Sequence, residues 1–373
     1  METKKTSVLN TLIFLTVTLM MTACHGKASM PAERAEGDTI VMRHARNLCL
    51  IQHADYTEAV IRNPWDTTQV LSRYILTEKG TRPNEAEGTL LKVPFHKAAV
   101  FTGVHCALLQ ELGCEGAIGG VCEVKYIGIP YIQKGVEEGR IADLGNGMAP
   151  NMESIMDLQP DVLMPSLFEN NSGYGRLERL GIPIVGCAEY METSPLAQAE
   201  WMRFYGRLFG KGTAADSLFA CIEKEYTTLK ETAMAVSEKP LVISELPQSG
   251  KWFVAAGQST SGQLYRDAGA DYAFSHIEGS GSVALSMEEV LEKAIHADLW
   301  MVKRYGAATR TQLTSEQPGL NRIAARMWLC DTQTSRYFEE APFHPEWVLE
   351  NLIQIFHPEL GIESEKKYFC PLE

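Results

Sequence analysis

Short apolar segments alternate with amphipathic stretches over most of the chain after residue 95. Six segments have the length and composition of buried strands, namely Ala98–Phe101, Ala117–Val121, Val162–Met164, Leu241–Ile243, Trp252–Val254 and Leu299–Val302. Helical patterns separate these segments. Strands alternating with helices are typical of α/β domains. The pattern therefore predicts two α/β lobes, residues 96–195 and 239–373.

The stretch between the lobes, residues 196–238, has almost no strand pattern. Within 214–237 the apolar residues recur at helical spacing, at Leu218, Cys221, Ile222, Tyr226 and Leu229. A helix of this length measures about 35 Å at about 1.5 Å per residue. We therefore expect a helical linker dominated by one long, rigid helix.

The N-terminal part of the chain has a different character. Residues 24–47 are polar and predict a flexible tether. Short apolar alternations in 53–77, around Asn63-Pro64-Trp65, predict a small β addition, followed by a turn-rich connector. We assign residues 48–95 to this addition and its connector.

The first 23 residues have the pattern of a signal peptide. Lys4 and Lys5 precede an apolar run from Val8 to Met21, and Thr22-Ala23 lead directly to Cys24. The run is too short for a spanning helix. The residues before Cys24 resemble the lipobox of bacterial lipoproteins, with Met21 where Leu is usual. We expect Cys24 to carry lipid, which anchors the protein to a membrane on its periplasmic side.

Charge and motif content exclude several classes of protein. The formal net charge of −13 argues against nucleic-acid binding, which needs a basic surface. The nine cysteines form no CxxC pair and the nine histidines are scattered, so we expect no side-chain metal site and no resident cofactor. GxSxG, P-loop and GxGxxG motifs are also missing, so the sequence predicts no catalytic residues.

Two helix starts, one in each predicted lobe, are alike. Asn151 and Ser286 are good N-cap residues, and each is followed two positions later by a glutamate, Glu153 and Glu288. Ser286 with Glu289 also has the pattern of a capping box. The apolar residues of both helices face the other way, so both glutamates are predicted to face solvent. A glutamate in the first turn is explained equally well by the helix dipole alone.

The ordered set of motifs resembles a known family. The motifs are "LLQELG", "IGGV", "DLGNGMAPNMESIMDLQPDV", "LERLGIPIV", a long helix, "GQLYRDAGA" and "LSMEEVLEKA". Together they resemble the periplasmic binding proteins of ABC importers for iron-siderophores, haem and vitamin B12, and the "HPEWVLENLIQIFHPEL" ending is similar to forms common in gut Bacteroidetes. The resemblance covers roughly residues 95–360.

This resemblance has implications for fold and partners. It implies two Rossmann-like lobes joined by a single rigid helix, with the ligand held between them. It further implies that Glu153 and Glu288 dock onto the permease dimer, which works with its ATPase. The expected cargo is an iron complex, a ferric siderophore or haem, already chelated on arrival.

Ligands of open α/β sheets bind beyond the carboxyl ends of the strands, and loops there supply the candidate contacts. A large chelate needs flat apolar surfaces with a few fixed polar groups, and arginines suit carboxylate or catecholate oxygens. The residues predicted to contact the ligand are Tyr126, Phe168, Asn170, Tyr174, Trp252, Arg304 and Arg336. Trp252 is included because its glycine and polar neighbours suggest an exposed loop, whereas Phe253 is expected in the lobe core.

Three other functions remain open at this point. The cargo could be a cobalamin or another corrinoid rather than an iron complex. The chain could be an envelope enzyme that modifies haem or a chelate. It could also be a surface interaction protein without a small ligand. A binding protein acquires the absorbance of its chelate unchanged, whereas an enzyme alters it.

Overall fold

The computed structural model describes residues 37–66, 68–84, 86–167 and 174–372. Residues 39–373 form one compact unit. The predicted signal peptide, Cys24 and most of the predicted tether lie outside the described residues. Among the described helices, none combines the length and apolarity needed to cross a membrane.

The N-terminal addition is a five-stranded sheet in the strand order β1-β2-β3-β4-β5. Its strands are β1 (Asp38–Ile40), β2 (Leu48–Gln52), β3 (Thr57–Arg62), β4 (Val70–Thr77) and β5 (Thr89–Lys92). β2, β3 and β4 pair antiparallel, whereas β4 and β5 are parallel. The sheet packs on the linker helices, since Tyr74 stacks on Phe204 with 6.0 Å between ring centroids. The Tyr74 hydroxyl also accepts a hydrogen bond from the Gly186 N–H.

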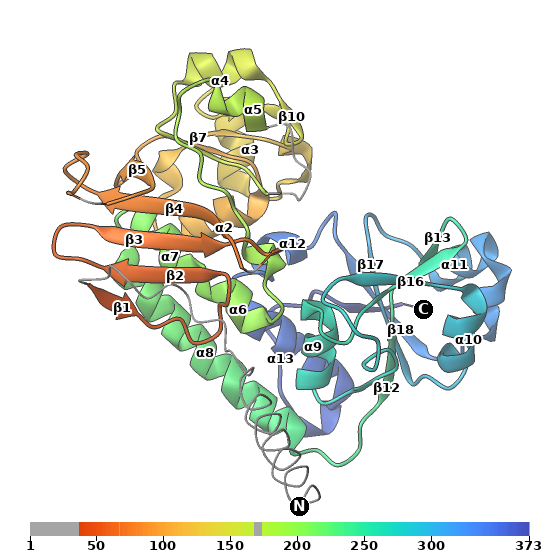
Figure 1. Cartoon of the computed structure of the whole chain (residues 1–373). Coiled ribbons are helices and arrows are strands. Elements are labelled where there is room, and N and C mark those ends of the chain that lie inside the picture. The colour runs from red at the N-terminus through yellow and green to blue at the C-terminus, as the bar shows by residue number, and fades with distance from the viewer. Residues whose placement is uncertain (1–36, 67, 85, 168–173, 373) are drawn as a thin grey trace, which may run out of the picture. The chain divides into compact units, whose positions relative to one another are not determined.

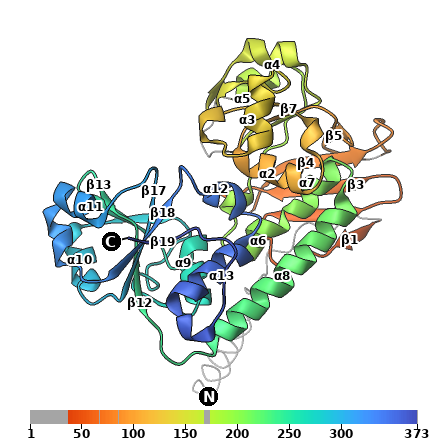
Figure 2. The ribbon, with the colours of Figure 1, turned by 180° about the vertical axis from the view of Figure 1, so that it is seen from behind.

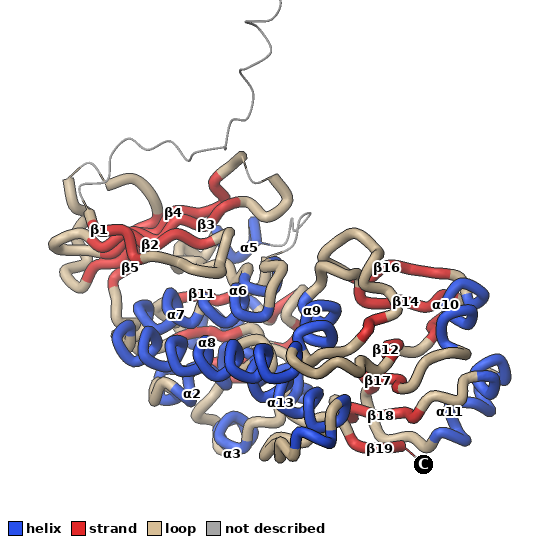
Figure 3. Tube along the Cα trace, turned by 90° about the horizontal axis from the view of Figure 1, so that it is seen from below, coloured by secondary structure: helices blue, strands red, loops and turns tan. Residues whose placement is uncertain are grey.

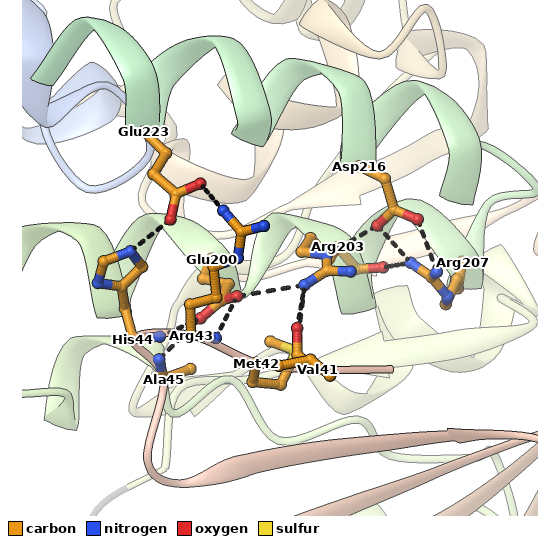
Figure 4. A network of polar contacts seen from close by, with 10 residues as sticks. All are labelled: Val41, Met42, Arg43, His44, Ala45, Glu200, Arg203, Arg207, Asp216 and Glu223. Atoms are coloured by element: carbon orange, nitrogen blue, oxygen red, sulfur yellow. Dashed lines mark hydrogen bonds and ion pairs between the residues drawn. The ribbon is translucent and has the colours of Figure 1, made fainter. Parts of the chain in front are cut away.

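The prediction of a flexible tether up to residue 47 is wrong for its last part. The backbone N–H groups of 43–47 donate to two glutamates of the linker region, Glu200 and Glu192, over 2.8–3.1 Å. Figure 4 shows the Glu200 side of this network. Glutamates far along the chain thus hold the segment, and its own polar composition gives no sign of them.

Glu200 is part of a larger charged network (Figure 4). Arg203 lies 3.2 Å from Glu200 and 2.8 Å from Asp216, and Arg207 pairs with the same aspartate over 2.8 Å. Neighbouring Arg203 and Arg207 hold the pKa of the Asp216 carboxyl below its usual value, although burial alone would raise it. The network connects the 43–45 segment to three linker helices, which contain Glu200, Arg203 with Arg207, and Asp216 respectively.

The N-terminal lobe contains a parallel four-stranded sheet in the order β11-β6-β7-β8. Its strands are β6 (Ala98–Val100), β7 (Ile118–Val121), β8 (Ala142–Asp143) and β11 (Val162–Met164), and a hairpin adds β9 (Gly145–Asn146) and β10 (Ala149–Pro150). The helices are α2 (Gly103–Glu111), α3 (Pro130–Glu137), α4 (Met152–Leu158) and α5 (Tyr174–Glu178), with short 3-10 turns η1 (Glu115–Ala117) and η2 (Val124–Tyr126). Residues 182–187 add only isolated bridges to this lobe, Leu163 with Ile184 and Ser166 with Cys187.

The linker contains the predicted long helix. η3 (Glu189–Met191), α6 (Pro195–Glu200) and α7 (Met202–Leu208) lead into α8 (Gly212–Met234), which runs unbroken for 23 residues. Its buried positions Ala215, Phe219, Ile222, Tyr226 and Ala233 recur at helical spacing and form one apolar side. α7 and α13 (Pro345–Phe356) pack against α8, and Figures 2 and 3 show α13 beside it.

The C-terminal lobe repeats the parallel design. Its main sheet has the order β15-β12-β17-β18-β19, in which only β19 is antiparallel to its neighbour. The strands of this sheet are β12 (Leu241–Ser244), β15 (Asp271–Tyr272), β17 (Leu299–Arg304), β18 (Arg326–Asp331) and β19 (Cys370–Leu372). A second, antiparallel sheet contains β13 (Pro247–Gln248), β14 (Lys251–Ala255) and β16 (Ser282–Leu285). The remaining elements are α9 (Thr260–Asp267), α10 (Met287–Ala294), α11 (Arg310–Glu316), α12 (Tyr337–Glu340), η4 (Pro318–Arg322) and η5 (Pro358–Leu360). The predicted α/β class and two-lobe architecture are confirmed (Figure 1).

Candidate functional site

A cavity of about 660 Å³ lies in the C-terminal lobe at the carboxyl ends of β12 and β17. The two strands are parallel neighbours and end at Ser244 and Arg304, so the loops that follow them meet at one edge of the sheet. This edge is where ligands of open α/β sheets bind. Its polar and apolar lining includes Glu245, Gln248, Phe253, Ser259, Lys303, Arg304, Leu313, Glu316 and Gln317.

The floor of the cavity holds an internal ion pair. Lys303 Nζ lies 2.5 Å from Glu245 Oε1, and Glu245 takes a left-handed backbone conformation with φ of 65°. Burial alone would lower the pKa of Lys303, but the adjacent Glu245 carboxylate raises it well above its ordinary value. Lys303 therefore keeps its charge and has an ion-pair partner within the protein.

Two other charged groups in the cavity are available to a ligand. Among the described residues, the side chains of Arg304 and Glu316 take part in neither an ion pair nor a hydrogen bond with the protein, and both line the cavity. A guanidinium offers several donors to a carboxylate or catecholate, and a carboxylate accepts hydrogen bonds from ligand N–H or O–H groups. The cavity therefore suits a ligand that carries both anionic and hydrogen-bond-donating groups.

The prediction for Trp252 is wrong, and its neighbour occupies the expected position. Trp252 is 0% exposed, whereas Phe253 is 42% exposed and lines the cavity. The Trp252 Nε1–H donates to Ser244 O over 3.0 Å, and its ring packs 5.7 Å from that of Trp300. Successive residues of a strand point to opposite faces, so a strand at 251–255 that buries Trp252 turns Phe253 toward the cavity.

Tyr126 lies opposite the loop that follows Arg304. Its ring meets that of Tyr305 edge to face, with 5.8 Å between centroids. The two side chains are 56% and 55% exposed. Two exposed aromatic rings from different lobes thus face each other beside the cavity-lining Arg304.

Arg336 does not join the cavity with Arg304. Its guanidinium lies 2.7 Å from Glu339 and 3.4 Å from Glu340, and it lines a separate cavity of about 250 Å³. Glu339 also accepts a hydrogen bond from the Gly128 N–H over 2.6 Å. Arg336 is therefore paired within the protein at a contact between the lobes, away from Arg304, and its predicted contact with the ligand stays a prediction.

Three other predicted contacts lie wholly or partly outside the described residues. Phe168 and Asn170 lie outside the described residues, and Tyr174 is described only as the first residue of α5. Conversely, Glu245, Lys303 and Glu316 line the cavity but were not predicted. Glu245 directly follows β12 and Lys303 precedes Arg304, so the strand-end rule that selected Arg304 also applies to them.

The two predicted docking glutamates have matching positions. Glu153 and Glu288 are both exposed, and each is the second residue of its helix, α4 or α10. The Asn151 side chain accepts from the Glu153 and Ser154 N–H groups, and Ser286 forms the predicted capping box with Glu289. The geometric part of the prediction is confirmed, and the docking role stays a prediction.

A second polar cluster is buried away from this cavity. His105, Cys187 and Glu189 bring their potential metal-ligating atoms within 4.8 Å of one another. The absence of local ligand spacing in the sequence could not reveal this group, because its members come from distant segments. The eight cysteines of the described residues are all free thiols.

Both the sequence and the structure of this chain are similar to those of known proteins. The sequence pattern of the periplasmic binding proteins matches residues 107–326. An uncharacterized lipoprotein of Methanocaldococcus jannaschii is 22% identical over 356 residues, which cover 89% of this chain and 85% of the relative.

Two proteins with named ligands are also similar. The petrobactin-binding protein of Bacillus subtilis is 25% identical over 230 residues, covering 60% of this chain and 69% of the relative. Its crystal structure superimposes with a TM-score of 0.55 at 16% identity, over 80% of this chain and 99% of that one. A periplasmic haem-binding protein of Pseudomonas aeruginosa gives a TM-score of 0.57 at 16% identity, over 75% of this chain and 98% of that one.

Proposed function

The chain belongs to the family of periplasmic binding proteins, and we propose that it captures an iron complex and delivers it to an ABC permease and its ATPase. The observation that carries the proposal is the cavity at the carboxyl ends of β12 and β17, with Arg304 and Phe253 in its lining. In this proposal the protein is a carrier and not an enzyme. It needs no cofactor, because the metal chelate is the cargo.

The chemistry of the cavity supports a chelate as ligand. Arg304 supplies a cation that has no partner among the described residues, Glu316 supplies an acceptor, and Phe253 supplies an exposed aromatic face. Ferric siderophores and haem combine anionic oxygens with flat apolar surfaces, which this set of side chains matches. The named ligands of two similar proteins, petrobactin and haem, belong to the same class. A corrinoid is the alternative cargo.

A spectroscopic titration tests the ligand. A ferric catecholate siderophore, haemin and cyanocobalamin are each added to the purified protein, and absorbance and intrinsic fluorescence are followed. We expect saturable binding of one iron complex whose chemical form is unchanged. Binding of cyanocobalamin alone would favour the corrinoid alternative, conversion of the chelate would indicate an enzyme, and no binding at all would contradict the proposal.

Arg304→Ala tests the position of the site. A hydrogen bond to a charged group contributes about 1.5–3 kcal/mol, so the variant should bind roughly 10–100-fold more weakly. Arg322→Ala is the matched control, because Arg322 is exposed and lies outside the cavity lining. Equal affinity of the two variants would show that the ligand binds elsewhere.

Delivery requires a surface that a permease can recognise, and we assign this role to Glu153 and Glu288. One exposed carboxylate on each lobe, at the same helical position, offers a dimeric permease two equivalent contacts. Charge pairs at an interface set orientation and encounter rate. The double alanine variant should bind ligand normally but fail to associate with the permease in a pull-down. Undiminished association would contradict the docking role.

A lipid anchor on Cys24 would keep the protein at the membrane on the side where this permease receives its cargo. The proposal rests on the sequence pattern before Cys24 and on the similarity to lipoproteins. Labelling cells with a fatty-acid analogue should mark the wild type and not Cys24→Ala. Equal labelling of both would exclude the anchor.

A further inference from the structure

Three segments converge on a buried site that shares no residue with the chelate cavity. His105 lies on α2, Cys187 forms the isolated bridge to Ser166, Glu189 is the first residue of η3, and Tyr205 lies on α7. All four residues are buried, with at most 5% of their surface exposed. A cluster of polar side chains in such surroundings needs charge compensation, because unpaired buried charges are costly.

The orientation of His105 is the main observation. Its Nδ1 lies 2.6 Å from Thr102 Oγ1, a hydrogen bond that fixes the ring. Its Nε2 is buried, makes no hydrogen bond and lies 3.4 Å from Glu189 Oε2. When Nδ1 donates its proton to Thr102, a lone pair of Nε2 is directed at a carboxylate oxygen. Two electron-rich atoms at this distance require a cation, either a proton or a metal ion, between them.

We propose that His105 Nε2, Cys187 Sγ and Glu189 Oε2 supply three of the four ligands of a structural site for a divalent transition-metal ion, with zinc as its occupant and water as the fourth ligand. Tyr205 supports the site, because its hydroxyl donates to Glu189 Oε2 over 2.5 Å. Metal-ligating histidines and carboxylates are commonly oriented by such outer hydrogen bonds. Here Thr102 orients the imidazole and Tyr205 orients the carboxylate.

The spacing fits the proposed ion. Zinc binds nitrogen and oxygen at about 2.0–2.2 Å and sulfur at about 2.3 Å in a tetrahedral arrangement, which places ligands roughly 3.3–3.7 Å apart. The His105–Glu189 distance of 3.4 Å falls within this range. The largest separation among the three ligand atoms is below 4.8 Å, so closing around the ion requires a side-chain shift of about 1 Å.

Charge and ligand type select the same class of metal. A thiolate and a carboxylate carry two negative charges and the imidazole is neutral, so a divalent cation makes the site neutral. Binding releases the thiol proton of Cys187, together with the proton on Nε2 when the imidazole is charged. Sulfur and nitrogen donors favour zinc and similar ions over calcium or magnesium, which prefer oxygen ligands.

The rival occupant is a proton. Burial alone would lower the pKa of His105, but Cys187 and Glu189 raise it well above its ordinary value. For Glu189, burial alone would raise the pKa of the carboxyl, but His105 lowers it. A protonated His105 paired with Glu189 is therefore the state that a metal ion must displace.

The site lies at a junction that a bound ion would stabilise. The His105 ring meets Phe343, which follows α12, with 6.0 Å between centroids, and Tyr205 meets the same ring at 5.9 Å. An ion bound here would connect α2 with the segment that leads into the linker helices, directly beside the C-terminal part of the chain. This role is independent of the chelate and of its delivery.

The test uses protein unfolded in a chelator and refolded with or without zinc, followed by gel filtration and elemental analysis. We expect about one equivalent of retained zinc, and after refolding with Co²⁺, a thiolate-to-cobalt charge-transfer band. Cys187→Ala should lose the band and bind zinc at least about tenfold more weakly. Cys106→Ala is the control, because Cys106 is equally buried beside His105 but outside the cluster.

Several results would overturn the site. Wild-type protein that retains no zinc, or a cobalt complex without the thiolate band, would show that a proton occupies the cluster. Loss of metal from Cys106→Ala to the same degree as from Cys187→Ala would show that Cys187 is not a specific ligand of the ion. If Cys187→Ala fails to fold, Glu189→Gln takes its place, because it removes a ligand charge at nearly constant volume. A Glu189→Gln variant that retains as much metal as wild type would also contradict the proposal.

Discussion

Glu200 anchors the N-terminal sheet to the linker, so its replacement should destabilise the protein severely. The side chain is 0% exposed. Its Oε1 accepts from the Arg43 N–H over 2.9 Å, and its Oε2 accepts from the His44 and Ala45 N–H groups over 2.8 Å each (Figure 4). Glu200→Ala removes the acceptor for all three donors and leaves Arg203 with one carboxylate fewer.

The size of the effect follows from these contacts. Removing one partner of a buried charged network costs about 3–5 kcal/mol, because the remaining groups stay buried without compensation. The three backbone N–H groups belong to a segment in which Ala45 and Asn47 are buried, so water replaces the lost acceptor poorly. A loss of ~3–5 kcal/mol is a large part of the roughly 5–15 kcal/mol that stabilises a typical protein.

Glu223→Ala is the matched control. Glu223 also binds the 43–44 segment, but through side chains, at 2.7 Å to Arg43 and 2.8 Å to His44. The Arg43 side chain is 68% exposed, and ion pairs that are open to solvent contribute roughly 0–1 kcal/mol. The two variants therefore remove a carboxylate from the same region with different expected costs.

Urea-induced unfolding followed by circular dichroism measures the free energy of unfolding, and hydrogen exchange of residues 48–62 reports on the sheet itself. We expect Glu200→Ala to lower the free energy by ~3–5 kcal/mol or to release β1–β5 with loss of exchange protection. Equal stability of Glu200→Ala and Glu223→Ala, with protection retained in both, would refute the anchoring role.

Two further predictions concern stability. Burial alone would lower the pKa of His344, but Glu111 and Glu346, each 2.6 Å away, raise it from 6.5 to about 9. The pKa of His344 is higher in the folded than in the unfolded protein, so protonated His344 stabilises the fold fully below pH 6.5. This stabilisation is lost as the pH rises through 9. The loss is at most roughly 3 kcal/mol for a difference of 2.5 pKa units. Urea midpoints at pH 6 and 9 should differ more for wild type than for His344→Gln, and equal differences would contradict this. Trp252→Ala truncates a buried aromatic side chain and should lower the free energy of unfolding by about 3–5 kcal/mol. Phe253→Ala should mainly weaken chelate binding. Unchanged thermal stability of Trp252→Ala would contradict this prediction.

The features that sequence predicted well are those set by neighbours in the chain. The caps Asn151 and Ser286, the capping-box partner Glu289 and the exposed positions of Glu153 and Glu288 all follow from spacing within one helical turn. The long helix was also correct, although its buried side includes Phe219 whereas Cys221 is exposed. Because α8 contacts several different elements, its buried apolar surface is wider than the single row of residues that the sequence pattern predicted.

The features that sequence missed depend on contacts between distant segments. The choice between Trp252 and Phe253 depends on which face of β14 covers the core, and the short apolar run fits either register. The 43–47 segment is held through its backbone N–H groups by the carboxylates of Glu192 and Glu200, about 150 residues away, and such contacts leave no trace in its composition. Arg336 is a local exception, because its partners Glu339 and Glu340 lie only three and four residues further along the chain, within one helical turn.

Uptake of a radiolabelled iron chelate by the host cell tests the central claim most directly. Cells that lack this protein are compared with cells that carry the wild type, using the chelate that the purified protein binds. The account predicts that uptake is lost without the protein and restored by the wild type, in proportion to the affinity of its cavity variants. Full uptake in cells that lack the protein would contradict a role in capture and delivery.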